Sequence, residues 1–191
     1  MTDIHSLSIA SFLSKLTRLS QAEINLIASL FKLIELKATD FFIEYGKPIG
    51  QIGFVVKGIL FKHDSDENGN LKVEKFICEG HFFTDREGYI EDIHSKPSIQ
   101  ALSTCLLFVM PMSDFKRLKA DYPHIAEVIN EILSKNFIEQ FRLTNHLLTG
   151  CVSQRIERFK IIFAKWVDLI PDKLMASYLD ISESSISHIH K

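Results

Sequence analysis

Residues 172–191 read D-K-L-M-A-S-Y-L-D-I-S-E-S-S-I-S-H-I-H-K and carry nearly every packing position of a helix-turn-helix. Two short helices that cross at roughly 90 to 120° need a small residue at their contact and a tight turn between them. Ala176 supplies the small residue, and Asp180 stands at the turn, where a left-handed backbone suits Gly best and tolerates Asp. Ser182 is placed to cap the second helix and Glu183 to begin it. The apolar packing positions are Met175, Leu179, Ile181, Ile186 and Ile189.

A helix-turn-helix lays its second helix in the major groove, so this stretch predicts a DNA-binding unit. With Ile186 and Ile189 buried, the other positions of the second helix face outwards. The residues that we predict to contact DNA are Lys173, Glu183, Ser184, Ser185, Ser187, His188 and Lys191. This set contains no arginine, the side chain that makes the commonest specific contact with guanine, so we expect affinity to depend on phosphate contacts from the lysines. The alternative is that this pair of helices serves folding alone.

The composition describes a globular protein whose charge is nearly balanced. Of the 191 residues, 46% are hydrophobic, which is enough for one sizeable domain or two small ones. The formal net charge is -2, so any DNA-binding surface must be a local patch. The N-terminus lacks a basic region followed by an apolar core, and no stretch approaches the roughly 20 apolar residues of a membrane helix. We therefore expect neither a signal peptide nor a membrane span.

The cysteines predict a reducing, cytoplasmic setting. Cys78, Cys105 and Cys151 are far apart and odd in number, which argues against a disulfide framework and against a Cys-x-x-Cys metal site. We expect all three to be small core residues. No phosphate-binding loop, nucleophile elbow or metalloprotease motif is visible, so we expect no catalytic activity, no metal and no cofactor.

Helical spacing at both ends of the chain encloses a β-rich middle. From Ser6 to Leu36, apolar residues recur at helical spacing, which predicts two amphipathic helices, the second with a capping box formed by Ser20 and Glu23. Between Phe41 and Met112, short β-branched or aromatic runs alternate with turn residues. This pattern predicts an antiparallel sandwich or barrel, with its strongest hairpin signal at Asn68-Gly69.

A long helix is predicted from Tyr122 to about Leu148, with Pro123 in its first turn and Gly150 after its end. Its apolar stripe needs a partner surface, either the protein's own barrel or a second copy of the chain. A continuous stripe after a compact barrel favours the second copy, so we predict a homodimer through the helix around Ile125 to Phe141. The stripe consists of Ile125, Ile129, Ile132, Leu133, Phe137 and Phe141.

This order of elements resembles the bacterial Crp/Fnr family of transcription regulators, in which a cyclic-nucleotide-binding-type jelly roll is joined by a dimerising helix to a C-terminal helix-turn-helix. In the barrel, F-V-V-K-G-I-L, with Gly58 at its turn, is similar to the family's strand-turn signature. At the C-terminus, M-A-S-Y-L-D-I-S-E-S-S-I-S-H-I aligns without a gap to the family's L-A-x-x-L-G-I-[ST]-x-x-[ST]-[LIV]-S-R-I. It departs from that pattern at Met175, Asp180 and His188.

The resemblance implies an α+β fold and a DNA-binding transcription regulator. Residues 1–118 would form an antiparallel β jelly-roll sensor domain with flanking helices, residues 119–149 the dimerisation helix, and residues 150–191 the helix-turn-helix domain. A rival hypothesis is a regulatory module that binds a protein or small molecule and whose helix-turn-helix is vestigial. The iron-sulfur branch of the family is disfavoured, since no cysteine precedes Cys78.

The resemblance also locates an effector pocket. Cyclic-nucleotide binders of this family hold the ribose with a Gly-Glu pair and the phosphate with an Arg-[Ser/Thr] pair, whose guanidinium matches phosphate geometry. Here these places read Thr84-Asp85 and Ser95-Lys96. Loss of such a buried bidentate pairing removes about 1.5 to 3 kcal/mol, so we do not expect cyclic AMP to bind.

The sequence allows several interpretations of this pocket. Arg86 follows Asp85 and could reach a phosphate from another angle. The barrel could hold a different small effector, or it could merely scaffold the dimer. We favour solvated loop positions for Asp85, Ser95 and Lys96 over effector contacts. The candidate effector residues are Thr84, Asp85, Arg86, Ser95 and Lys96.

Overall fold

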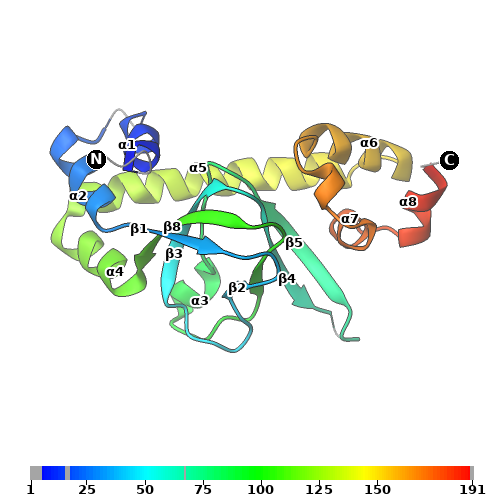
Figure 1. Ribbon diagram of the computed structural model, residues 1–191, viewed down its shortest axis with the longest axis horizontal. Coiled ribbons are helices and arrows are strands. Elements are labelled where there is room, and N and C mark those ends of the chain that lie inside the picture. Colours follow the sequence, from blue (N-terminus) through cyan, green and yellow to red (C-terminus); the bar gives the residue numbers. More distant parts are fainter. Residues whose placement is uncertain (1–5, 16–17, 67, 190–191) are drawn as a thin grey trace.

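The computed structural model describes residues 6–15, 18–66 and 68–189, with the backbone alone for residues 6–8 and 188–189. It consists of a β sandwich covered on one side by a long helix that leads to a small helical unit (Figure 1). The elements are α1 (Ser6–Ser14), α2 (Gln21–Ser29), β1 (Lys32–Leu36), β2 (Phe41–Ile43), β3 (Gln51–Lys57), β4 (Leu60–Ser65), β5 (Leu71–Ile77), β6 (Phe82–Phe83), α3 (Arg86–Glu91), β7 (Ser98–Ala101), β8 (Cys105–Pro111), α4 (Met112–Asp121), α5 (Pro123–Leu148), α6 (Val152–Ile162), the 3-10 helix η1 (Val167–Leu169), α7 (Asp172–Leu179) and α8 (Glu183–Ile189).

The strands form two antiparallel sheets, with the orders β1-β8-β3-β6 and β2-β7-β4-β5. Buried side chains from both sheets make one core, which includes Phe42, Val55, Leu60, Ile99 and Leu107. Helices and antiparallel sheets together confirm the predicted α+β class. Within the described residues the two sheets remain separate, so the predicted barrel is an open sandwich.

The helical pattern predicted up to Leu36 ends earlier in the structure. Ser20 caps α2 as predicted, since the Ser20 N–H donates to Glu23 Oε2 at 2.7 Å and the Glu23 N–H donates to Ser20 Oγ at 3.3 Å. The prediction of helix beyond Ser29 was wrong, because Lys32–Leu36 forms β1 and pairs with β8. Ile34 and Leu36 pack against the sandwich core with Glu35 exposed between them, and a period of two residues is that of a strand.

Two turns within the sandwich follow directly from the sequence. The Asn68-Gly69 hairpin joins β4 to β5, with Gly69 at φ 79° and its N–H donating to Asp66 O at 2.9 Å. Gly58 lies between β3 and β4 at φ 100°, where a Cβ atom would come within 2.8 Å of Thr104 O. Position 58 therefore requires glycine, the left-handed backbone at Gly69 favours it, and the predicted hairpin is confirmed.

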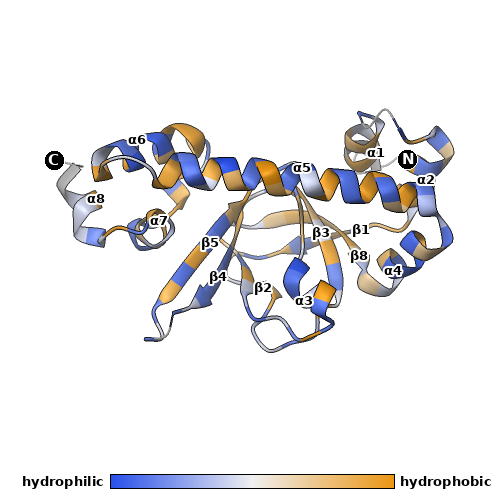
Figure 2. Ribbon diagram, turned by 180° about the vertical axis from the view of Figure 1, so that it is seen from behind, coloured by the Kyte–Doolittle hydropathy of each residue, from blue (hydrophilic) through white to orange (hydrophobic). Residues whose placement is uncertain are grey.

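The long helix α5 crosses the whole molecule and packs on its own chain at its N-terminal end. It begins at Pro123, so the predicted boundary after residue 118 falls inside α4. Ile125 is 0% exposed and lies in a core formed with α1, α2 and α4, so this end of the predicted dimer contact is wrong. Phe137, Ile138 and Phe141 are exposed, and Figure 2 shows apolar residues recurring along the full length of the helix. None of the described helices is long and apolar enough to span a membrane.

Candidate functional site

The last two helices of the described chain meet as the sequence predicts. Asp180 joins them in a left-handed conformation with φ 51° and ψ 53°, and the Ile181 N–H donates to Ala176 O at 3.1 Å. Met175, Ala176, Leu179 and Ile186 are buried, and Ile181 packs against the same core. The predicted turn and packing positions are therefore confirmed, apart from Ile189, whose side chain lies outside the described residues.

Most of the predicted DNA-contacting residues are exposed. Lys173 lies on α7, and Glu183, Ser184 and Ser187 lie on α8, all open to solvent. Ser185 is half-buried, and its Oγ lies 2.7 Å from Ser182 Oγ, so it is tied into the start of the helix. The side chain of His188, and Lys191 as a whole, lie outside the described residues.

Two arginines of α6 hold this unit together, a role that the sequence reading missed. Arg155 Nη1 donates to Leu179 O at 3.3 Å, at the end of α7. Arg158 Nη1 donates to His146 O at 2.9 Å and to Thr149 O at 2.8 Å, at the end of α5. A cation at a helix C-terminus satisfies carbonyls that have no partner within the helix. These arginines are therefore structural.

The effector-pocket candidates separate into a buried pair and exposed residues. Asp85 is 1% exposed and Ser95 is 2% exposed, so their interpretation as solvated loop residues was wrong. The Ser95 hydroxyl lies 2.8 Å from both Asp85 Oδ2 and Pro97 O, and it can donate to one of them at a time. Lys96 is exposed, with its Nζ 3.2 Å from Glu87 Oε1, as expected for a solvated position.

A lysine of β4 faces the buried carboxyl group of Asp85. Lys62 Nζ lies 3.7 Å from Asp85 Oδ1 and 2.8 Å from Glu74 Oε2. Asp85 Oδ1 is buried and accepts no hydrogen bond from the described residues, so the Lys62 ammonium group offsets its charge across 3.7 Å. Gly88 packs on the other side, where a Cβ atom would come within 2.7 Å of Asp85 Oδ2. Residues of the chain itself thus surround the Asp85 carboxyl group, to which the family resemblance gives the role of binding a ligand.

A second lysine stands beside the first. Lys75 on β5 is the direct cross-strand partner of Lys62 on β4. Burial holds the pKa of Lys75 below its usual value, and the charge of Lys62 lowers it further. The sequence pattern did not single out either lysine, because each follows the ordinary alternation of a strand.

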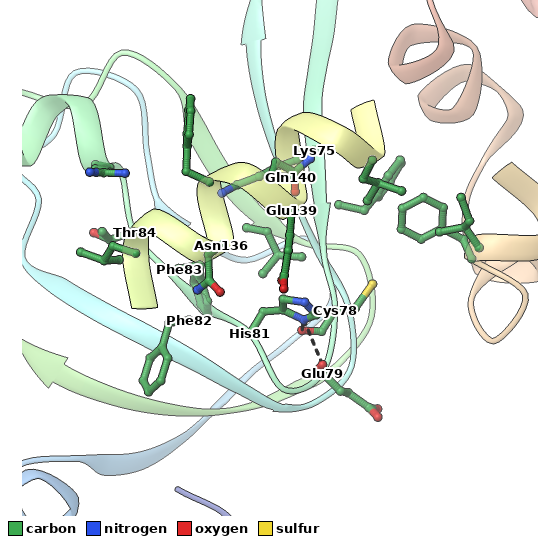
Figure 3. Close-up of a pocket in the computed structure, with 18 of the residues that line it drawn as sticks. Lys75, Cys78, Glu79, His81, Phe82, Phe83, Thr84, Asn136, Glu139 and Gln140 are labelled. Carbon is green, nitrogen blue, oxygen red and sulfur yellow. Dashed lines mark hydrogen bonds between the residues drawn. The ribbon is translucent and has the colours of Figure 1, made fainter. Parts of the chain in front are cut away.

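A cavity of about 520 Å³ lies next to this cluster, between the sandwich, α5 and the C-terminal helices. Thr84 and Arg86 line it, whereas Asp85, Ser95 and Lys96 do not. Figure 3 shows polar side chains projecting from α5 towards those of β5 and of the segment after it. The cavity is lined by basic, acidic, polar and aromatic side chains, which include Lys75, Glu79, His81, Arg86, Asn136, Glu139, Gln140, Phe82, Phe163 and Trp166.

His81 presents one ring nitrogen to the backbone. Its Nδ1 lies 3.2 Å from Cys78 O and 3.1 Å from Glu79 O, and both of these atoms are acceptors. Nδ1 therefore carries the proton in this arrangement, which makes Nε2 an acceptor while the ring is neutral. Within the described ranges, no three His, Cys, Asp or Glu side chains gather closely enough to hold a metal ion.

The three cysteines differ in environment, which corrects the expectation that all are core residues. Cys105 is buried, Cys78 is half-buried and Cys151 is exposed before α6. Burial raises the pKa of Cys78 to about 12, whereas a hydrogen bond from Ser153 lowers the pKa of Cys151. The thiolate is the reactive form of cysteine, so reactivity follows exposure and pKa together.

We expect Cys151 to be alkylated first in the native protein. With iodoacetamide at about pH 7.5, mass spectrometry should find Cys151 modified well before Cys78, and Cys105 last. Unfolding in urea should remove the differences. Modification of Cys78 as fast as Cys151 in the folded protein would contradict the burial described above.

The half-buried ring of His63 on β4 should make the folded protein less stable in acid. Its Nε2 is buried and has no hydrogen-bond partner among the described residues, its ring lies 5.0 Å from that of Phe61, and burial lowers its pKa from 6.5. The folded protein thus disfavours the protonated ring. The free energy of unfolding therefore decreases as the pH falls below 6.5, the pKa of histidine in the unfolded chain. We expect urea unfolding to show a decline between about pH 7 and pH 5, no steeper than about 1.4 kcal/mol per pH unit for this single proton. His63→Phe should flatten the decline, and an equally steep profile in this variant would contradict the assignment.

Known proteins match this chain in fold. Its sequence matches no protein-family model and no curated protein. A solved structure from Eubacterium rectale, described as a transcriptional regulator of the Crp/Fnr family, has a TM-score of 0.72 and 16% identity, over 94% of this chain and 85% of that one. The regulator CLP of Xanthomonas campestris has a TM-score of 0.67 and 16% identity, over 89% of both chains. FixK2 of Bradyrhizobium japonicum has a TM-score of 0.64 and 11% identity, over 83% and 81%. The chain therefore has the fold of the Crp/Fnr regulators, the family that its sequence motifs resemble.

Proposed function

We propose that the chain is a dimeric, DNA-binding transcription regulator without catalytic activity. The observation that carries the proposal is the packed pair of α7 and α8, joined by the left-handed turn at Asp180, with Lys173, Ser184 and Ser187 exposed. In this motif the second helix enters the major groove, so α8 is the proposed recognition helix. The fold that the chain shares with known regulators supports this assignment.

The proposed dimer forms through the middle of α5. Phe141 lies four residues after Phe137 and three after Ile138, and all three are exposed on this helix. A cluster of large exposed apolar side chains on one helix marks an interaction surface. A second copy is the proposed partner, because two recognition helices must reach half-sites roughly 34 Å apart.

Selection of bound DNA from random sequence tests the function. We expect enrichment of paired half-sites with about one helical turn between their centres, and binding that weakens steeply with salt. Lys173→Ala should reduce the salt slope by about one, whereas Lys57→Ala, which removes an exposed lysine of β3, should leave it unchanged. A dimer that enriches no sequence would overturn the proposal and favour a regulatory module that does not bind DNA.

The cavity beside α5 is the proposed effector site. Its walls come from the sandwich, from α5 and from the segment after α6, so an occupant would touch all three parts of the molecule. A molecule that binds one arrangement of these parts better than another shifts the equilibrium towards that arrangement.

We expect this effector not to be a cyclic nucleotide. Lys62 and Ser95 already face the Asp85 carboxyl group, and Ser95 stands at the place that the family gives to arginine. Calorimetric titration with cyclic AMP and cyclic GMP should therefore give no binding at micromolar concentration. Micromolar affinity for either nucleotide would show that the cavity has a phosphate site of a different design.

A further inference from the structure

We propose that a contact between α7 and the edge strand β5 positions the recognition helix, with Ser177 as its positioning residue. This contact is called the β5 latch below. It consists of Ser177, the backbone of Leu71 and Val73, and the rings of Phe76, Phe159, Phe163 and Tyr178. Its existence is independent of the proposed function, and its effect on DNA affinity rests on that function.

Ser177 completes the hydrogen bonding of a sheet edge. β5 is the last strand in the order β2-β7-β4-β5. The Val73 N–H donates to Ser177 Oγ at 2.9 Å, and Ser177 Oγ donates to Leu71 O at 2.9 Å. One side chain of α7 thus satisfies a donor and an acceptor that a further strand would otherwise pair. A hydroxyl group is the smallest side chain that does both.

An aromatic cluster extends the same contact. The Phe76 ring of β5 lies 5.3 Å from that of Tyr178 on α7, 5.7 Å from that of Phe159 on α6, and 5.4 Å from that of Phe163 at the end of α6, all in edge-to-face geometry. These rings belong to one continuous core that also includes Phe61 of β4. The helical unit therefore shares its core with the outer face of the sheet, and the two cannot separate without exposing these rings.

The latch leaves the proposed DNA-contacting residues free. Lys173, Glu183, Ser184 and Ser187 are exposed while α7 is held on β5. Ile186 of α8 is buried in the shared core, so the latch fixes the direction of α8 without covering it. A recognition helix already held in place avoids the cost of being ordered when it binds, so release of the latch should weaken DNA binding.

The latch also adjoins the cavity. Phe76 and Phe163 contribute both to the aromatic cluster and to the cavity wall. A molecule in the cavity would therefore touch the two rings that join β5 to the helical unit. Binding in the cavity could therefore be coupled to the position of α8 through contacts within one chain, in addition to any coupling through the dimer helix.

Paired variants at Ser177 test the proposal. In Ser177→Ala we expect faster hydrogen exchange of the Val73 amide and DNA affinity about threefold to tenfold lower, the effect of one lost hydrogen bond. Ser177→Thr keeps the hydroxyl group and should restore both. Ser113→Ala, which removes an exposed serine of α4, is the matched control and should change neither. Sedimentation should show the same oligomeric state for all four proteins.

Unchanged exchange at Val73 in Ser177→Ala would overturn the latch. Faster exchange with DNA affinity within about twofold of the unmodified protein would overturn its positioning role. If the unmodified protein binds no DNA, the proposed function fails, and the exchange measurement still decides whether the latch exists. Phe76→Leu weakens the same contact from the sheet side and should lower DNA affinity in the same direction, so the test does not depend on Ser177→Ala folding well.

Discussion

Phe141→Glu should convert the protein to a monomer and lower its affinity for a paired DNA site by about 100-fold or more. Phe141 is 60% exposed and Phe137 is 63% exposed, four residues apart on α5, so more than half of each side chain is left uncovered by the described part of the chain. A glutamate in the proposed dimer contact would be buried without a partner, which dimerisation cannot offset. Without the dimer the second half-site is bound only by a separate molecule, and the gain from bivalent binding is lost.

Sedimentation and a mobility-shift titration measure this effect together. Lys135→Ala changes an exposed residue on the same helix, whose Nζ lies 2.9 Å from Glu131 Oε1, and should leave the dimer and the affinity intact. Because Phe141 is exposed, Phe141→Glu should fold normally, and circular dichroism checks that it does. A folded monomer that still binds the paired site with full affinity would show that dimerisation does not serve DNA binding.

Lys62→Met should lower the free energy of unfolding by about 3 kcal/mol. The side chain of Lys62 is 14% exposed and that of Asp85 is 1% exposed, so the substitution leaves a buried carboxyl group without its facing ammonium group. The methionine fits the same space, so the loss reflects charge and not a void. Urea unfolding at about pH 7 measures the change. A loss below about 1 kcal/mol would mean that Ser95 and its surroundings suffice to hold Asp85.

Lys75→Met is the matched control and should have the opposite sign. Lys75 stands directly across from Lys62, and like charges in this position are destabilising. Its pKa is lowered below 10.5 mainly by burial, so at neutral pH the folded protein holds an ammonium group that it disfavours. Removing it should raise the free energy of unfolding, and the gain should shrink as pH rises towards 10.5, where the lysine also loses its proton in the unfolded chain. Equal losses in the two variants would show that the lysines act through packing alone.

The features predicted correctly from the sequence are those that form between near neighbours in the chain. The capping box of Ser20, the hairpin at Asn68-Gly69 and the left-handed Asp180 each depend on a backbone geometry set within about four residues. The helical spacing that predicts α5 has the same local origin. Helical spacing led to a wrong prediction at Ile34. A short run of apolar residues fits both the helical and the strand period, and pairing with the strand β8 decides between them.

The candidate site depended on contacts between distant residues. Asp85 and Ser95 could be named because the family resemblance gives their place, but their burial could not be predicted. Lys62 on β4 comes to face Asp85, which follows β6 of the other sheet, only through the packing of the two sheets. The same holds for Ser177, which reaches the backbone of β5 across more than a hundred residues.

The sequence by itself determined α2, the long helix α5, the two turns and the motif at the C-terminus, because hydrogen bonds and steric limits between neighbouring residues select them. Only the tertiary structure decided which charges are buried together, which part of α5 is left exposed and how α7 is held on β5. These outcomes depend on which surfaces the folded chain brings into contact, and burial changes the free energy of a charge or a ring far more than its neighbours in sequence do.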